Sequence, residues 1–142
     1  MSEKYGRILG VDVGTKWTGL ARTDLLKTSA NPIGTFPTED VFEEIEKIVS
    51  SEKVEFIVVG WPLTPGGGEG RAVKMVKRFL RRLRKRLPAV KIEKFDERYS
   101  SKQAVNAMEE AGVPKTKRND TYRKNQAAAA IILQEYLKEV VH

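Results

Sequence analysis

"RILGVDVGTKWTGLA", residues 7–21, places a single carboxylate, Asp12, inside an apolar run with strand character. Glycines surround it at positions 10, 14 and 19. A carboxylate that is buried without a partner is strongly unfavourable, and it tends to become neutral. Asp12 therefore either belongs to a tight corner of the backbone or lies at a strand end where it binds a positively charged group.

The segments that follow this stretch alternate between strand and helix patterns. The first three strands are joined by short connections, which favour an antiparallel meander, and Thr38 is the N-cap candidate of the next helix. We expect strands at 7–13, 15–23, 30–36, 54–60 and 89–95 and helices at 38–52, 69–87, 100–112 and 121–141. This β-β-β-α-β-α-β-α order, with one more helix at the end, predicts an α/β fold. It consists of a mixed five-stranded sheet with helices on both faces, in one domain over 1–142.

The composition limits the classes of function. The 142 residues, 40% of them hydrophobic, suit a single core. The absence of cysteine excludes disulfides and thiolate chemistry, and the lone histidine, His142, does not support a histidine-based triad or zinc site. No apolar run approaches the ~20 residues of a membrane span, and we expect neither a signal peptide nor a membrane partner. The net charge of +7 and the pI of about 9.7 favour a polyanionic partner.

Carboxylates follow two of the predicted strands. Asp12 lies near the end of the first strand, and Asp96 and Glu97 come directly after the last one. If these two strands are neighbours, the carboxylates meet at one end of the sheet and form a site for Mg²⁺, which prefers hard oxygen ligands and substrate phosphates. We expect the two strands to be adjacent, and Asp12 and Glu97 to approach closely enough to share a metal. The alternative is that Asp12 caps a turn and Asp96 caps a helix.

The predicted helix over 69–87 is strongly basic on its outer faces. Its apolar residues keep a helical period and are expected to face the core. The other faces have almost no acidic residues to offset the charge, which favours contact with phosphates; the alternative is a solvated face. The positive residues are Arg71, Lys74, Lys77, Arg78, Arg81, Arg82, Arg84, Lys85 and Arg86.

The glycine-rich segment before this helix does not match a phosphate-binding loop. "GGGEGR" lacks the Lys-Ser/Thr pair of one such motif, and Arg71 occupies the last glycine position of the other. We interpret it as a surface loop or a mobile segment beside an active site. Trp61 is interpreted as a packing residue rather than as a platform for base stacking.

With these residues in view, the chain resembles the YqgF/RuvX family, Holliday-junction resolvases also described as pre-16S rRNA nucleases. The resemblance runs almost end to end and rests on "GVDVGTKWTGLA", "IVVGWPL" with the following "GGGEGRAVKMVKRF", "FDERYSS" and "AAAAIILQEYL". It implies a ribonuclease H-like fold, hydrolysis of phosphodiester bonds that depends on Mg²⁺ or Mn²⁺, and a cytoplasmic location.

The resemblance also implies site residues. Asp12 matches the acidic residue of the first strand, and Glu97 matches the acidic residue of the family's D-E-R motif, with Asp96 beside it. The family usually has an aspartate at the start of the last helix, where this chain has Asn125. Asparagine lends a neutral oxygen, so a second metal is expected to bind more weakly, unless Asp120 substitutes. The alternative is that Asn125 only caps the helix.

Several functions agree with these residues. The first is a metal-dependent nuclease acting on structured RNA, in 5′-end processing of pre-16S rRNA during ribosome biogenesis. The second is a resolvase of four-way DNA junctions, which would act as a homodimer, and the third is a catalytically weak nucleic-acid-binding protein. "DVGTKWTGLA" also looks like the first phosphate loop of actin-like ATPases, but these need two such domains. The residues expected to contact nucleic acid are Arg71, Arg78, Arg81, Arg82, Lys85, Arg98, Lys117 and Arg118.

Replacing Arg81, Arg82 and Lys85 with neutral residues should weaken binding to nucleic acids of every sequence to a similar degree, because phosphate contacts do not read bases. The slope of log affinity against log salt concentration should flatten by about 0.7–0.9 for each phosphate that the protein no longer neutralises. Binding titrations over a range of salt concentrations measure both effects. An unchanged slope would mean that these charges form only a solvated face.

Overall fold

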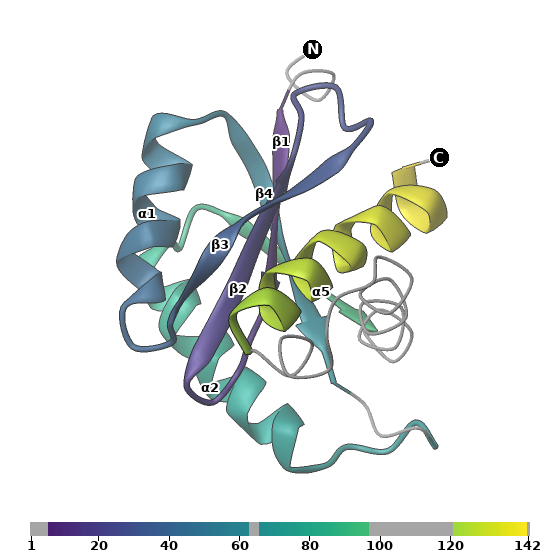
Figure 1. The fold of residues 1–142 in the computed structure, drawn as a ribbon. Helices are drawn as coiled ribbons and strands as arrows, with labels where there is room; N and C mark the ends of the chain where they lie inside the picture. Colours follow the sequence, from purple (N-terminus) through teal and green to yellow (C-terminus); the bar gives the residue numbers. More distant parts are fainter. Residues whose placement is uncertain (1–5, 63–65, 97–120, 142) are drawn as a thin grey trace.

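A five-stranded sheet of order β3-β2-β1-β4-β5 forms the centre of the structure, a computed structural model that describes residues 6–62, 66–96 and 121–141 (Figure 1). The first three strands form an antiparallel meander, and β4 and β5 run parallel to β1. The predicted mixed sheet is confirmed, and so is the predicted order of the described elements. The elements are β1 (Arg7–Asp12), β2 (Trp17–Thr23), β3 (Ala30–Pro37), α1 (Val41–Ser51), β4 (Val54–Trp61), α2 (Arg71–Arg86), β5 (Lys91–Asp96), α5 (Thr121–Tyr136) and η2 (Leu137–Val141).

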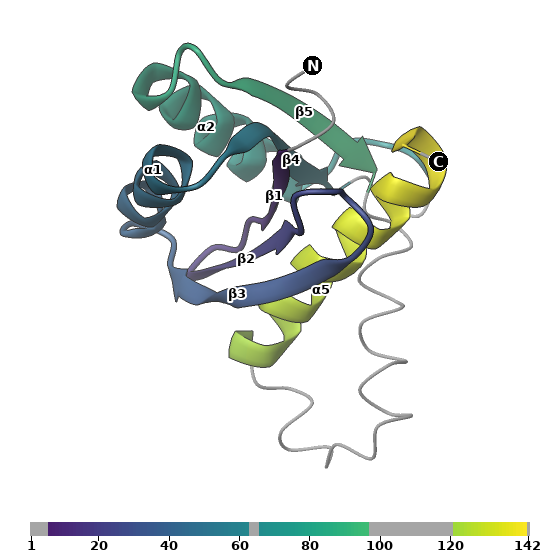
Figure 2. The same cartoon turned by 90° about the horizontal axis from the view of Figure 1, so that it is seen from above.

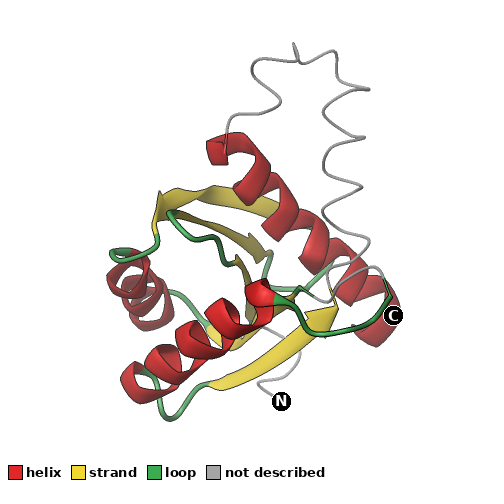
Figure 3. Ribbon diagram, turned by 90° about the horizontal axis from the view of Figure 1, so that it is seen from below, coloured by secondary structure: helices red, strands yellow, loops and turns green. Residues whose placement is uncertain are grey.

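Helices cover both faces of the sheet (Figure 2, Figure 3). Leu9 and Val11 of β1 are buried against α1 and α2, where the rings of Phe42 and Phe79 stack with 4.7 Å between their centroids. Ile8 belongs to a second cluster on the opposite face, formed with α5. The two clusters follow from the alternation of side chains along a strand, which turns successive residues of β1 to opposite faces.

Two glycines let α5 lie directly on the sheet. A Cβ at Gly10 of β1 would come within 2.6 Å of the Leu133 side chain, and a Cβ at Gly19 of β2 within 2.2 Å of the backbone of Asn125. A larger side chain at Gly19 would displace the backbone of α5, and one at Gly10 would displace the Leu133 side chain. Gly10 and Gly19 therefore serve the packing of α5 and fix its height above β1 and β2.

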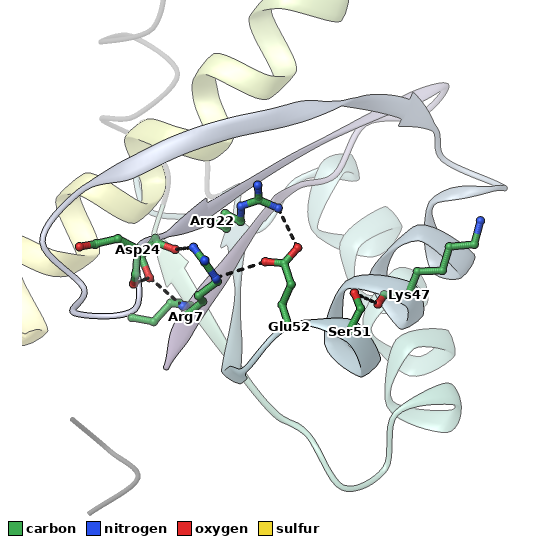
Figure 4. Close-up of polar contacts among 8 residues, drawn as sticks. Arg7, Arg22, Asp24, Lys47, Ser51 and Glu52 are labelled. Carbon is green, nitrogen blue, oxygen red and sulfur yellow. Dashed lines mark hydrogen bonds and ion pairs between the residues drawn. The ribbon is translucent and has the colours of Figure 1, made fainter. Parts of the chain in front are cut away.

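A polar cluster joins the strands at the end of the sheet away from Asp12 (Figure 4). Glu52, in the turn between α1 and β4, forms ion pairs with Arg7 of β1 at 3.3 Å and with Arg22 of β2 at 2.8 Å. The Arg7 guanidinium also donates a hydrogen bond to the carbonyl of Thr23 at 3.1 Å. These contacts link the start of β1, the end of β2 and the start of β4, so the three central strands keep a fixed register at this end.

Some local expectations are corrected and others are confirmed. Thr38 is not the N-cap of α1, because that helix begins at Val41 after Asp40; the Thr38 hydroxyl instead donates to the carbonyl of Gly14 at 2.8 Å. The helix expected at 100–112 lies outside the described residues.

α2 has the predicted amphipathic pattern, and it buries Val73, Val76, Phe79, Leu80 and Leu83. In the part of the chain described here, no helix is long and apolar enough to cross a membrane.

Gly19→Ala should destabilise the fold, because its Cβ would overlap backbone atoms of α5 rather than a flexible side chain. We expect the free energy of unfolding to fall by about 1–3 kcal/mol, the usual cost of overpacking. Urea unfolding of the purified variant measures this change. Gly66→Ala is the control, since a Cβ there meets nothing within 4 Å; equal stability of the two variants would contradict the close approach of α5.

Candidate functional site

Asp12 is the last residue of β1, and its surroundings make it the centre of the candidate site. The residue is only 9% exposed. It pairs with Gly19 of β2 in the antiparallel ladder, beneath the first half of α5. Since Ile8 and Gly10 face α5, the alternation of β1 places Asp12 on the same face. The carboxylate therefore lies at the carboxyl end of β1, between the sheet and α5.

Asn125 of α5 contacts this end of the sheet. Its side-chain amide donates a hydrogen bond to the backbone carbonyl of Trp17 at 2.8 Å. Its Nδ2 lies 3.3 Å from the place where a Cβ on Gly14 would be, so the side chain reaches the loop that follows Asp12. Asn125 is the fifth residue of α5, which begins at Thr121, and so it is not the N-cap. Its side chain instead holds α5 to the turn between β1 and β2.

The far end of α5 is anchored to β5. The Tyr136 hydroxyl donates a hydrogen bond to Glu93, and the Tyr136 ring packs edge-on against Phe95 at 5.8 Å. Burial and the neighbouring carboxylate raise the pKa of Tyr136. Hydrogen bonds from Lys91 and Tyr136 lower the pKa of Glu93. α5 is thus fixed near Asp12 at one end and at β5 at the other.

The strands that bear the predicted carboxylates are not neighbours. β4 lies between β1 and β5, so the expectation of adjacent strands is wrong. Both strands nevertheless run parallel to β4, and their carboxyl ends lie at the same end of the sheet. Asp96 pairs with Trp61, and it lies on the α2 face because Phe95 faces α5. Glu97 lies outside the described residues.

The oxygen donors near Asp12 suit a hard divalent cation. Asp12 supplies a carboxylate, and the Oδ1 atom of Asn125 is a neutral oxygen on an anchored side chain. Within the described ranges, no group of three or more acidic, histidine or cysteine side chains could hold a metal. Mg²⁺ often binds through one or two carboxylates and completes its shell with water and substrate phosphates. The donor set fits such an open site and not a closed cage of protein ligands.

A threonine pair supports the loop after Asp12. The buried Thr18 hydroxyl lies 2.8 Å from the Thr38 hydroxyl, which also donates to the Gly14 carbonyl at 2.8 Å. The pair connects the turn between β1 and β2 to the segment before α1. Sequence reasoning missed this role; the one signal was a threonine, Thr18, at an inward position of a predicted strand.

The outer face of α2 is basic, as predicted, but its charge is partly compensated. Ion pairs join Lys77 to Glu69 at 3.4 Å, Arg82 to Glu39 at 3.4 Å and Arg86 to Glu46 at 3.3 Å. The expectation of almost no acidic neighbours is therefore too strong. Among the residues described, no ion pair involves Arg71, Lys74, Arg78, Arg81, Arg84 or Lys85. The other residues expected to contact nucleic acid, Arg98, Lys117 and Arg118, lie outside the described part of the chain.

Comparison with known proteins places the chain in a family. A family model described as "RuvX: Holliday junction resolvase" matches residues 6–139. The chain belongs to the RuvX family. Two similar RuvX relatives, from Chlorobaculum tepidum and Salinibacter ruber, are both named "Putative pre-16S rRNA nuclease". The first is 39% identical over 96% of both chains, and the second is 40% identical over 92% of both.

Solved structures share the RuvX chain's fold at low sequence identity. RuvC of T. thermophilus, in complex with a Holliday junction substrate, is 15% identical with a TM-score of 0.53, over 96% of this chain and 97% of RuvC. The large terminase nuclease of phage G20c is 11% identical with a TM-score of 0.51, over 92% of this chain and 81% of that one. At these identities the similarity concerns the fold alone, and the predicted ribonuclease H-like fold is confirmed.

Proposed function

We propose that this protein is a metal-dependent nuclease that hydrolyses phosphodiester bonds in structured RNA, in 5′-end processing of cytoplasmic pre-16S rRNA. The main observation in favour is the position of Asp12, a buried carboxylate at the carboxyl end of β1 beneath α5. A metal ion held there would have oxygen donors from the protein and would leave positions of its shell for water and substrate phosphates. The names of the RuvX relatives agree with this activity.

The proposed roles follow from the positions of the side chains. Asp12 and Glu97 hold Mg²⁺ or Mn²⁺, and Asn125 contributes its carbonyl oxygen. The alternation of β5 turns Phe95 to the α5 face and Asp96 away from it, so we expect Glu97 to be the better ligand of the two acidic residues. A divalent cation bound there would supply an activated water and stabilisation of the leaving oxygen. The cations on the outer face of α2 bind phosphates of the substrate.

A four-way DNA junction is the second candidate substrate. The similarity of the fold to RuvC favours it, because that structure is a complex with a Holliday junction substrate. Symmetric cleavage of two strands would require a homodimer of this chain. An assay of precursor rRNA and four-way junctions side by side therefore distinguishes the two functions by which substrate is cleaved. Binding of nucleic acid without cleavage of either substrate would indicate a protein that only binds nucleic acid.

Asp12→Asn should abolish cleavage of the substrate while preserving binding to it. The amide keeps the size of the carboxylate but removes the charge that holds a divalent cation. We expect cleavage of precursor rRNA in Mg²⁺ or Mn²⁺ to fall by at least about 100-fold, or about 2.7 kcal/mol in barrier height. Asp96→Asn, on the other face of the sheet, is the matched control. Equal losses in the two variants would argue against a site centred on Asp12.

Asn125→Asp should lower the stability of the protein without a divalent metal and increase the stabilisation that a divalent metal provides. Without metal, the carboxylate loses the donor to the Trp17 carbonyl and faces an acceptor, so the free energy of unfolding should fall by about 1–3 kcal/mol. With Mg²⁺ or Mn²⁺, the added charge should increase the metal-induced rise in Tm above that of the wild type and lower the metal concentration for half-maximal cleavage. Cleavage by the wild type should be faster in Mn²⁺, which binds a given site more tightly.

Thermal unfolding and cleavage over a titration of each metal measure these effects. Asn125→Ala is the control, since it removes the hydrogen bond without adding charge. If the metal titrations of Asn125→Asp and the wild type coincide, position 125 is not a ligand position.

A further inference from the structure

α2 lies alongside β5, the strand at one border of the sheet (Figure 2). Side chains of the two elements line a basic pocket. It has a volume of about 280 Å³. α2 contributes most of its lining, and β4 and β5 contribute one residue each. We call this pocket the edge pocket. Its lining residues are Trp61, Lys77, Leu80, Arg81, Arg84 and Lys94.

The edge pocket gathers four cations and no acidic side chain in its lining. Lys77 has an ion pair, with Glu69 at 3.4 Å, outside the lining itself. Across the described residues, no ion pair involves Arg81, Arg84 or Lys94. Like charges held together in this way repel one another. A bound anion would remove that repulsion, so the pocket is suited to a group with several negative oxygens.

The surroundings of Trp61 favour a phosphate over a base in the edge pocket. The indole is half-buried and packs against the hydrophobic core beneath α2. The Lys94 ammonium lies 4.2 Å from the centre of the ring, in the position of a cation–π contact. A base could stack on this ring only after Lys94 had left it. A phosphate, in contrast, needs only the four cations to turn toward it.

The edge pocket is separate from the candidate site at Asp12. Trp61 and Asp96 form the last pair between β4 and β5, so the pocket lies toward the carboxyl ends of the strands, as Asp12 does. Lys94 and Trp61, however, lie on the face covered by α2, whereas Asp12 lies on the face covered by α5. A phosphate in the pocket is therefore not the one that is cleaved.

We propose that the edge pocket binds the phosphodiester backbone of a nucleic-acid segment that flanks the cleavage site. This inference rests on the proposed nuclease function, and it adds Lys94 of β5, next to Trp61, to the cations of α2 that meet the substrate. The substrate would be held on both faces of the sheet around its β4–β5 end. Contacts on both faces of the sheet favour a folded or branched substrate, which can reach both faces, over an isolated linear strand.

The test measures binding of a short fluorescein-labelled oligouridine by anisotropy, in EDTA so that no cleavage occurs. Uridine stacks weakly, so backbone contacts dominate. Arg84→Gln and Lys94→Gln should each weaken binding about fivefold at about 0.1 M salt, because each contact to a single strand contributes about 0.7 to the log–log salt slope. Lys47→Gln is the matched control: it removes the same charge from an exposed lysine of α1, whose ion pair is a 3.7 Å contact with Glu44.

Tryptophan emission supplies a second readout. Oligouridine should change the emission of the wild type as Lys94 turns from the indole, and Trp61→Phe should remove this part of the change. Unchanged affinity and salt slope in both glutamine variants would overturn the proposal, as would a weakening no larger than that of Lys47→Gln. If the wild type binds through Arg84 and Lys94 but cleaves neither precursor rRNA nor a four-way junction, the pocket is supported and the nuclease function is not.

Discussion

The contact between the α5 backbone and two bare glycines determines the rest of this structure. Gly10 and Gly19 have no side chains to hold the helix away, so α5 lies against β1 and β2. This closeness brings the Asn125 amide within hydrogen-bond distance of the Trp17 carbonyl. It also covers Asp12 at the end of β1 and leaves it 9% exposed. The chemistry proposed for this end of the sheet depends on a packing distance set by two missing side chains.

Charge is distributed unevenly over the described residues. At the amino end of β1, Glu52 compensates Arg7 and Arg22, and Glu55 forms a 2.7 Å ion pair with Lys27. On α2, most cations have no such partner in the described structure. An excess of positive charge on one helix produces a field that attracts polyanions from a distance. Acidic residues thus compensate the cations at the amino end of β1, whereas most cations of α2 form no ion pair within the described residues.

The sequence predicted the elements well because their signals are local. The apolar period of α2 and the alternation of β1 depend on neighbouring residues, and both were confirmed. The position of β4 between β1 and β5 was missed, because strand order depends on crossover connections that leave no local pattern. The hydrogen bond from Asn125 was missed for a related reason, since its partner, Trp17, is 108 positions away in the chain. The site residues that the resemblance implies stay predictions, and it was the fold that assigned Asp96 to the α2 face.

The residues at the two borders of the sheet affect how folded molecules meet one another. β3, at one border, contains Pro32, which cannot donate to an added strand, and its ladder with β2 shifts register between Leu20 and Ala21. β5, at the other border, is only six residues long and has lysines at positions 91 and 94. Short, charged or proline-containing border strands resist pairing with another chain. Both borders of the described sheet therefore discourage its extension by a neighbouring molecule, which lowers the tendency of the folded protein to aggregate.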